Sequence, residues 1–286
     1  MDLDQLNQYL KKAAEERNRR RISEFEGYSP KEMQSILYDT FGKDSPIRLK
    51  KMKSADYERI PLLNQIKYMM HLVEKAGELK LTKRGNLPVK VVADIYEQGY
   101  IEDYFIEKGI SKLYKEEDTQ SINLPKILLE ISGLVKKRNN KWSLTKKGSE
   151  LLTDDRALLR RMWHYFGSRF NWAYYDGYES EKIGQLGSGF TLILLSKFGD
   201  KLRGDAFYGA KYLKAFPFLL EEIHETNFRS GKETFFHCYS LRTFDRFLDY
   251  FGLIHIQKGS WQDPTMISKT PLFSKMIQII PPVKND

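Results

Sequence analysis

Four basic residues gather around one short turn in the stretch LVKKRNNKWSLT, residues 134–145. Lys136, Lys137 and Arg138 precede the pair Asn139–Asn140, and Lys141 follows it. Asn tolerates the backbone of tight turns, so the stretch predicts two strands joined by a hairpin, with the cations close together. Cations at such a hairpin can contact the phosphates of a nucleic acid. The other interpretation is a charged, solvated hairpin whose lysines keep strand edges from pairing.

The helix predicted just before this hairpin could also face a nucleic acid. SINLPKILLEIS, residues 121–132, offers Asn123 and Lys126 as its main candidates. A helix that reads the major groove needs side chains such as Arg, Lys, Asn or Gln that reach base edges. Only two such residues are present, so we expect this helix to contribute little to nucleic-acid binding.

A second pair of candidates lies in SLRTFDRFLDYFG, residues 240–252. Arg242 and Arg246 are one helical turn apart and could face a groove together. Asp245 and Asp249 alternate with them, and ion pairs within the helix would neutralise that face. Both interpretations remain open from the sequence.

Aromatic residues are dense between positions 163 and 178. Aromatic rings mixed with arginine can stack exposed bases or anchor a protein partner, but they also fill the junction between two domains. We favour the junction, because large rings bury much area. The candidate interface residues are Trp163, Phe170, Trp172 and Tyr175.

Possible catalytic groups have simpler explanations. Glu221 and His224 have the spacing of helical carboxylate metal sites, but no second copy of the motif is present. His237 and Cys238 are adjacent, and on an extended segment their side chains would point to opposite faces. The sequence contains no P-loop, HExxH or GxSxG motif. We therefore predict no enzymatic activity, no metal site and no cofactor.

Composition limits the partners further. The formal net charge is +9, but it is spread along the chain: Lys and Arg outnumber Asp and Glu by 12 to 10 in residues 1–56, by 17 to 13 in residues 57–153 and by 18 to 15 in residues 154–286. An acidic partner is thus supported only where cations cluster locally.

No long apolar segment or signal peptide is evident, and Cys238 is the single cysteine. We therefore expect a cytoplasmic protein without disulfides.

The periodicity predicts two similar units of mainly α structure with small antiparallel β-hairpins. Residues 1–56 predict a helical arm and a basic linker, with Ser29, Pro30 and Glu32 beginning a helix. Residues 57–153 predict the order helix, strand, helix, helix, strand, turn, strand, in which ELKLT and KWSLT are the first and third strands of one sheet. Residues 154–183 predict a helical aromatic connector, and residues 184–286 repeat the order more loosely.

The first unit resembles the winged-helix (winged helix-turn-helix) superfamily in this element order and in its pattern of GL, an apolar strand and LTxKG. The second unit is similar, which implies tandem winged-helix domains. More narrowly, SPKEMQSILYDTF followed by KLTKRGNLPVK resembles a bacterial family of uncharacterised proteins related to plasmid-encoded ORF-3-like proteins. That family implies no activity and no functional residues.

The sequence therefore favours a protein that binds duplex DNA, with a regulator of transcription as one role. The candidate contacts are Lys136, Lys137, Arg138, Lys141, Asn123, Lys126, Arg242 and Arg246. The alternative is a protein-interaction scaffold built from the same units, which should expose an apolar patch in place of a basic stripe. The target, the partner and the oligomeric state do not follow from the sequence.

Overall fold

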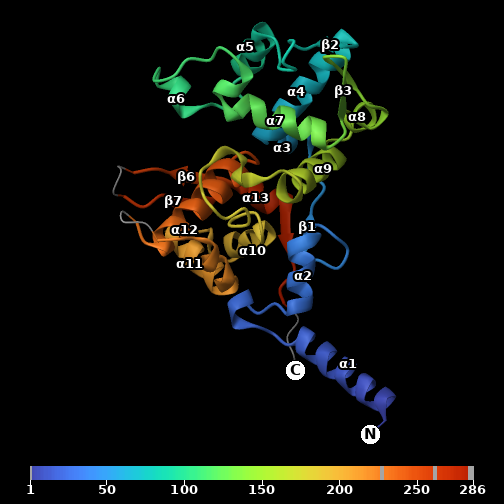
Figure 1. Cartoon of the computed structure of the whole chain (residues 1–286), viewed down its shortest axis with the longest axis vertical. Helices are drawn as coiled ribbons and strands as arrows, with labels where there is room; N and C mark the ends of the chain where they lie inside the picture. The colour runs from blue at the N-terminus through green and yellow to red at the C-terminus, as the bar shows by residue number, and fades with distance from the viewer. Residues whose placement is uncertain (1, 226–228, 260–262, 283–286) are drawn as a thin grey trace.

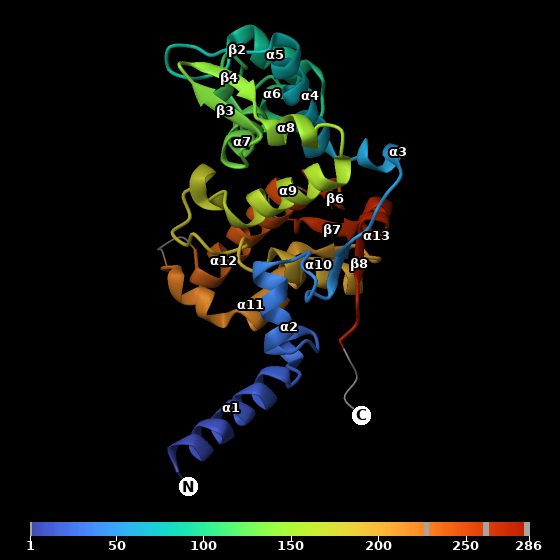
Figure 2. The same ribbon diagram turned by 90° about the vertical axis from the view of Figure 1, so that its right-hand side faces the viewer.

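The chain is mainly helical with small antiparallel sheets, as the sequence predicted (Figure 1). The computed structural model describes residues 2–225, 229–259 and 263–282. Figures 1 and 2 show an upper unit of green and cyan elements, a lower unit of yellow to red elements, and helix α1 extending away from the lower unit. None of the described helices combines the length and apolar character needed to span a membrane.

The upper unit has the element order predicted for residues 57–153. Its helices are α4 (Pro61–Ala76), α5 (Val89–Glu97), α6 (Tyr104–Glu107), α7 (Gln120–Ile131) and α8 (Lys146–Leu151), with a 3₁₀ turn η2 (Glu116–Asp118) before α7. Its strands are β2 (Leu79–Lys80), β3 (Val135–Arg138) and β4 (Lys141–Leu144). The sheet has the order β2-β4-β3, so ELKLT and KWSLT do pair as its first and third strands.

The lower unit repeats this strand order. Its strands are β5 (Arg203–Gly204), β6 (Ile254–Gln257) and β7 (Met266–Lys269), in the order β5-β7-β6. Its helices are α10 (Ser188–Phe198), α11 (Asp205–Ala215), α12 (Gly231–Ser240) and α13 (Pro271–Met276), with a 3₁₀ helix η4 (Pro217–Glu222) and a π-helix η5 (Leu241–Leu248). α11 ends at Ala215, and η4 begins two residues later at Pro217. Part of the predicted second turn, residues 260–262, lies outside the described residues.

The N-terminal segment is part of the lower unit, apart from α1 (Leu3–Arg19). It forms η1 (Ser23–Phe25), α2 (Pro30–Tyr38), β1 (Ile47–Leu49) and α3 (Ser54–Tyr57). The predicted start of α2 is confirmed, because Ser29 and Glu32 form a capping box around Pro30. α2 packs closely on α10, where a Cβ atom on Gly189 would lie 2.7 Å from the carbonyl oxygen of Ile36.

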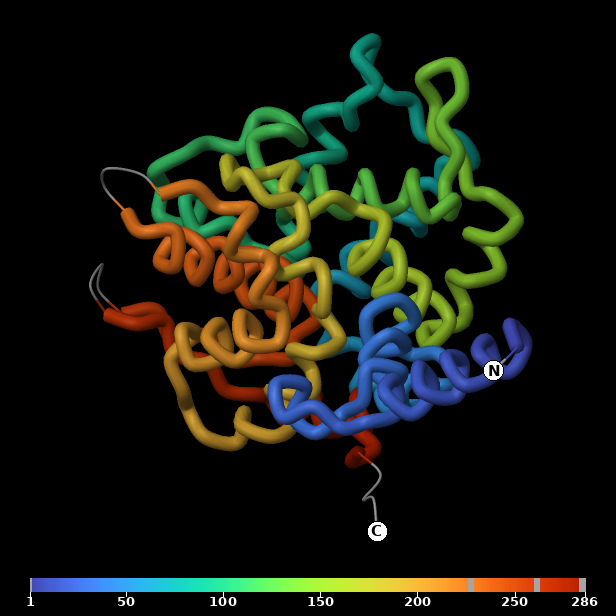
Figure 3. Tube along the Cα trace, turned by 60° about the horizontal axis from the view of Figure 1, so that its bottom comes forward, coloured from blue at the N-terminus to red at the C-terminus, as the bar shows by residue number. Residues whose placement is uncertain are grey.

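The prediction of a basic linker before residue 57 was wrong. β1 pairs antiparallel with β8 (Ile277–Ile279), close to the C-terminus, with Ile47 opposite Ile279 and Leu49 opposite Ile277. Figure 3 shows the blue N-terminal segment beside the orange and red C-terminal part. Ile47 and Leu49 are buried, so burial of alternate apolar residues holds a strand in which charged neighbours had suggested a linker.

Candidate nucleic-acid interface

The register of the upper sheet decides where its basic side chains point. Lys80 lies opposite Lys141, and Lys141 lies opposite Arg138 on its other side. Residues directly opposite in antiparallel strands share a face, and residues two apart in one strand do as well. Lys80, Lys136, Arg138 and Lys141 therefore share the outer face of the sheet, and all four are exposed.

The opposite face of this sheet is fixed to the core. Val135 and Trp142 are buried there, and the Trp142 indole Nε1 donates to Glu130 of α7 at 2.8 Å. Lys137 belongs to this side, and its Nζ donates to the Gly85 carbonyl oxygen in the loop after β2 at 3.1 Å. Packing on one face thus forces the row of cations on the other face toward solvent.

The turn that closes the hairpin has the backbone that its sequence predicted. Asn139 and Asn140 both have positive φ angles, 51° and 53°. Two consecutive positive φ values are those of the type I′ turn, whose twist matches a two-stranded hairpin. The two asparagines therefore close β3 onto β4 directly and keep Arg138 and Lys141 opposite one another.

One carboxylate, that of Glu78, lies beside the cations on the outer face of the sheet. Glu78 lies 2.6 Å from Nζ of Lys141 in an exposed ion pair. The hydrogen bond from Lys141, together with the charges of Lys141 and Lys136, lowers the pKa of Glu78. Within the described ranges, Lys136 and Arg138 form no hydrogen bond or ion pair through their side chains. The outer face therefore keeps a surplus of positive charge.

Sequence reasoning missed part of this surface. Lys80 was not considered, although the predicted pairing of the first and third strands would have placed it beside Lys141. Lys83 and Arg84 are exposed in the loop after β2, which the bond between Lys137 and Gly85 holds beside the hairpin. The signal was present in the phrase LTKRG, which carries these two cations immediately after the first strand.

The helix α7 does not support the predicted contacts of Asn123 and Lys126. Lys126 is only 8% exposed and its Nζ lies 2.8 Å from Glu116. Asn123 accepts a hydrogen bond from the hydroxyl of Tyr175. α7 packs against α4, α5 and α9 (Asp155–Ser168), so the helix is a core element and these side chains are occupied within the fold. Neither residue is available to a groove in this structure.

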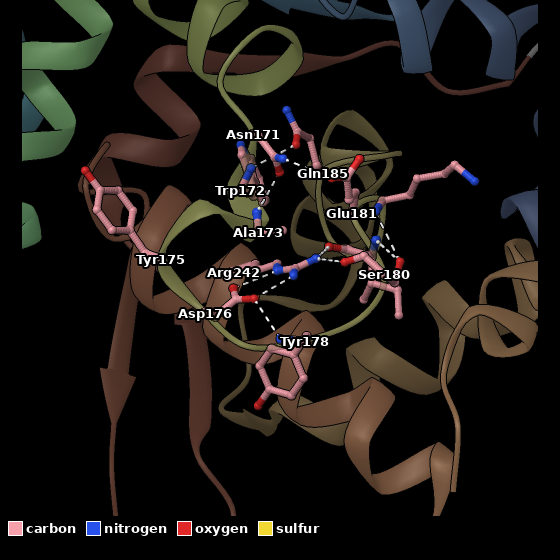
Figure 4. Close-up of polar contacts among 12 residues, drawn as sticks. Asn171, Trp172, Ala173, Tyr175, Asp176, Tyr178, Ser180, Glu181, Gln185 and Arg242 are labelled. Carbon is pink, nitrogen blue, oxygen red and sulfur yellow. Dashed lines mark hydrogen bonds and ion pairs between the residues drawn. The ribbon is translucent and has the colours of Figure 1, made fainter.

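Arg242 and Arg246 also prove to be internal. Arg242 is fully buried and Asp176 is 4% exposed. Nε and Nη2 of Arg242 lie 2.9 Å and 2.7 Å from the two carboxylate oxygens of Asp176, and Nη1 donates to Ser180 at 2.7 Å (Figure 4). Arg246 is 16% exposed and binds the same carboxylate at 3.1 Å.

The two arginines do lie on one side of their helix, but this side faces the protein. The expected ion pairs with Asp245 and Asp249 are not the ones formed; Asp245 pairs with Lys258 at 3.1 Å. The partner Asp176 lies in the loop after η3 (Trp172–Tyr175). The prediction that Arg242 and Arg246 contact DNA is therefore wrong for this conformation, because a bidentate carboxylate already holds Arg242 in the interior.

The aromatic connector is largely buried, and the rings of Trp163 and Trp172 pack on rings of the lower unit. Trp163, Phe170 and Trp172 are buried. The ring centroid of Trp163 lies 5.2 Å from that of Phe41 and 4.7 Å from that of Phe247. Tyr175 is half-buried, and its bond to Asn123 joins the connector to α7. These rings fill internal space and are not exposed for base stacking.

The candidate catalytic groups stay apart. His224 is exposed and its Nδ1 lies 2.9 Å from a carboxylate oxygen of Glu179, and Glu221 belongs to the 3₁₀ helix η4. His237 and Cys238 lie on helix α12 and not on an extended segment, yet they still face differently: His237 is exposed and Cys238 is buried. Among the described residues, no cluster of three His, Cys, Asp or Glu side chains could hold a metal ion.

Cys238 is expected to be unreactive in the folded protein. Burial raises the pKa of its thiol to about 12, and the thiolate is the reactive form. With Ellman's reagent at pH 8, we expect no labelling of the native protein within minutes and one thiol per chain after denaturation in guanidinium. Rapid stoichiometric labelling of the native protein would contradict the buried position.

One of three comparisons with known proteins finds a match, and it covers the upper unit. No curated protein and no solved structure matches the chain. Residues 58–157, which run from the end of α3 to the first turn of α9, match the family model of the Y4jL N-terminal domain.

Proposed function

We propose that the upper unit is a winged-helix domain that contacts the phosphate backbone of duplex DNA through the outer face of its sheet. The observation that carries this proposal is the row of four exposed cations, Lys80, Lys136, Arg138 and Lys141, on one face of three paired strands. We name this row the sheet cations. Phosphate contacts supply most of the sequence-independent affinity of proteins for DNA.

Topology supports the winged-helix assignment. The unit has three main helices and a three-stranded sheet of order β2-β4-β3. The hairpin of β3 and β4 corresponds to the wing, and α7 to the third helix. The lower unit has a sheet of the same order, with β6 and β7 as its hairpin, which supports tandem domains.

The mode of contact differs from that of the common winged-helix proteins. The third helix usually enters the major groove, but here α7 is packed on α4, α5 and α9 and Lys126 is paired with Glu116. The wing and the adjacent loop remain as the contact surface. Backbone contacts position a protein on a duplex without reading its sequence. We therefore expect binding with little sequence preference, and no catalytic residue is required.

Binding to a random-sequence duplex across a salt series tests this proposal. We expect fluorescence anisotropy to show a complex that weakens steeply with salt. Lys136→Glu combined with Arg138→Glu should weaken it at least about tenfold and reduce the slope of log K against log salt by about 2, since each lost phosphate contact removes about 0.9. Both side chains lack partners in the described structure, so the substitutions should leave the fold intact.

The matched control is Lys108→Glu combined with Lys112→Glu, which changes the net charge equally. Both lysines are exposed near α6, which Figure 1 places on the other side of the upper unit from β3. Equal losses in the two double variants would show an effect of net charge alone. Absence of binding at low salt would overturn the proposal.

A protein-interaction scaffold is the second candidate, and a separate surface favours it. In α6 and the segment that joins it to η2, four large side chains are exposed: Tyr104, Phe105, Ile110 and Tyr114. Apolar side chains that gather on one segment are typical of protein contacts. If the duplex does not bind, this segment is where we would place a protein partner.

A further inference from the structure

A second positively charged site lies outside the upper sheet, in a groove between α9 and the segment from the end of α2 to β1. The groove has a volume of about 470 Å³. Lys43, Arg48, Arg156 and Arg160 line it, and we call these four residues the groove cations. Arg156 and Arg160 are one turn apart on α9, so their side chains lie on the same face of that helix.

Neutral backbone oxygens hold the three arginines in place. Nη1 of Arg48 donates to Gly42 and Nη2 to Lys43, both at 3.0 Å. Nη2 of Arg156 donates to Leu49 at 3.0 Å, and Nη2 of Arg160 donates to Phe41 at 3.1 Å. A carbonyl oxygen orients a guanidinium without cancelling its charge. Arg156 and Arg160 each use one of five N–H donors in these bonds, which leaves donors for a ligand.

The charges in this groove are not balanced. Asp154 is the carboxylate in its lining, against four cations. Oδ1 of Asp154 accepts a hydrogen bond from the backbone N–H of Ala157 at 2.9 Å, as the cap of α9. In the part of the chain that the structure describes, none of the groove cations forms an ion pair with a carboxylate. Four like charges held together in this way favour an anion between them.

A smaller cavity of about 210 Å³ adjoins the groove and shares Phe41 and Arg160 with it; we call it the extension. Asp39, Thr40, His164 and Ser168 line this extension, so one carboxylate lies in it. Burial lowers the pKa of His164, and the nearby arginines Arg169, Arg161 and Arg160 lower it further, against an opposing effect of Asp39. The extension offers polar contacts and room for a small organic group.

We propose that this groove binds a phosphate group through Lys43, Arg48, Arg156 and Arg160. Planar guanidinium groups match the oxygens of a phosphate and bind them with two parallel hydrogen bonds, while lysine adds a point charge. The phosphate belongs either to a small phosphate ester, whose organic part enters the extension, or to the backbone of a duplex. Figure 1 places the groove segments, α9 and the β3–β4 hairpin on the right-hand side of the molecule, which allows the second source.

Calorimetric titration of the full chain with inorganic phosphate and with AMP, at constant ionic strength, tests the first source. We expect both to bind the wild type, and Lys43→Gln to weaken binding about tenfold or more, because a hydrogen bond to a charged group is lost. The Lys43 side chain bonds to no other group within the described residues, so its loss should not loosen the loop. Arg156→Gln combined with Arg160→Gln should abolish binding, with thermal melting to verify folding.

Lys90→Gln on α5 is the charge-matched control and should bind phosphate like the wild type. Titration with the random-sequence duplex tests the second source of the phosphate, the backbone of a nucleic acid. If phosphate and AMP do not bind but Lys43→Gln weakens duplex binding and Lys90→Gln does not, the groove holds a backbone phosphate. If Lys43→Gln changes neither kind of binding, the proposal is overturned. The sheet cations are tested separately, because Lys136→Glu with Arg138→Glu should leave AMP binding unchanged.

Discussion

Replacing Asp176 by Asn is expected to lower the free energy of unfolding by roughly 3–5 kcal/mol, the usual cost of removing one partner from a buried ion pair. Arg242 is fully buried, and the lost carboxylate accepts two of its hydrogen bonds and one from Arg246. Asn keeps the size of the side chain but removes its charge. A buried guanidinium would then remain without a compensating negative charge.

Denaturant unfolding followed by circular dichroism measures this loss. Asp200→Asn is the matched control, because Asp200 is 75% exposed and pairs with Lys269 at 2.9 Å, so its loss should cost less than about 1 kcal/mol. Adding Arg242→Met to Asp176→Asn should recover part of the loss, since it removes the unpaired charge. A change below about 1 kcal/mol in Asp176→Asn would contradict the buried pair.

Replacing Gly148 by Ala is expected to cost about 1–3 kcal/mol or more, as overpacking of a core does. A Cβ atom at this position would lie 2.1 Å from the carbonyl oxygen of Leu134. That oxygen cannot easily move, because it accepts hydrogen bonds from both the backbone N–H and the hydroxyl of Thr145. The glycine of the LTKKG phrase thus lets α8 start directly against the base of the β3–β4 hairpin.

The same unfolding measurement tests this prediction. Gly177→Ala is the control, since an added Cβ there meets no atom within 4 Å, and it should change stability by no more than about 0.5 kcal/mol. If Gly148→Ala displaces the hairpin, it should also weaken duplex binding. Unchanged stability in Gly148→Ala would mean that α8 and Leu134 are not in close contact.

Local patterns predicted several elements well. The capping signal at Ser29 and the pairing of ELKLT with KWSLT both depend on residues close in sequence or on a repeated phrase. The hairpin cations followed from one short stretch, and their exposure follows from the register. These features could be predicted from the sequence because the position of each side chain depends on its neighbours along the chain.

Features that depend on distant partners could not be predicted. Arg242 was predicted to contact DNA because its partner Asp176 could not be recognised: it lies 66 positions away, in a loop without periodicity. Lys126 was predicted to be exposed, but it is buried and paired with Glu116 on a helix that packs on three others. Strand β1 was hidden among charged residues, since its partner β8 is near the other end of the chain. The groove cations come from two segments that only the fold brings together.

The pairing of β1 with β8 has a consequence for the order of folding during synthesis. The hydrogen bond from the Tyr28 hydroxyl to Ile280 joins residues 252 positions apart. The upper unit, which depends on contacts among residues 61–151, can form as soon as that stretch leaves the ribosome. The lower unit must wait for β8, so β1 stays unpaired until residues 277–279 have left the ribosome.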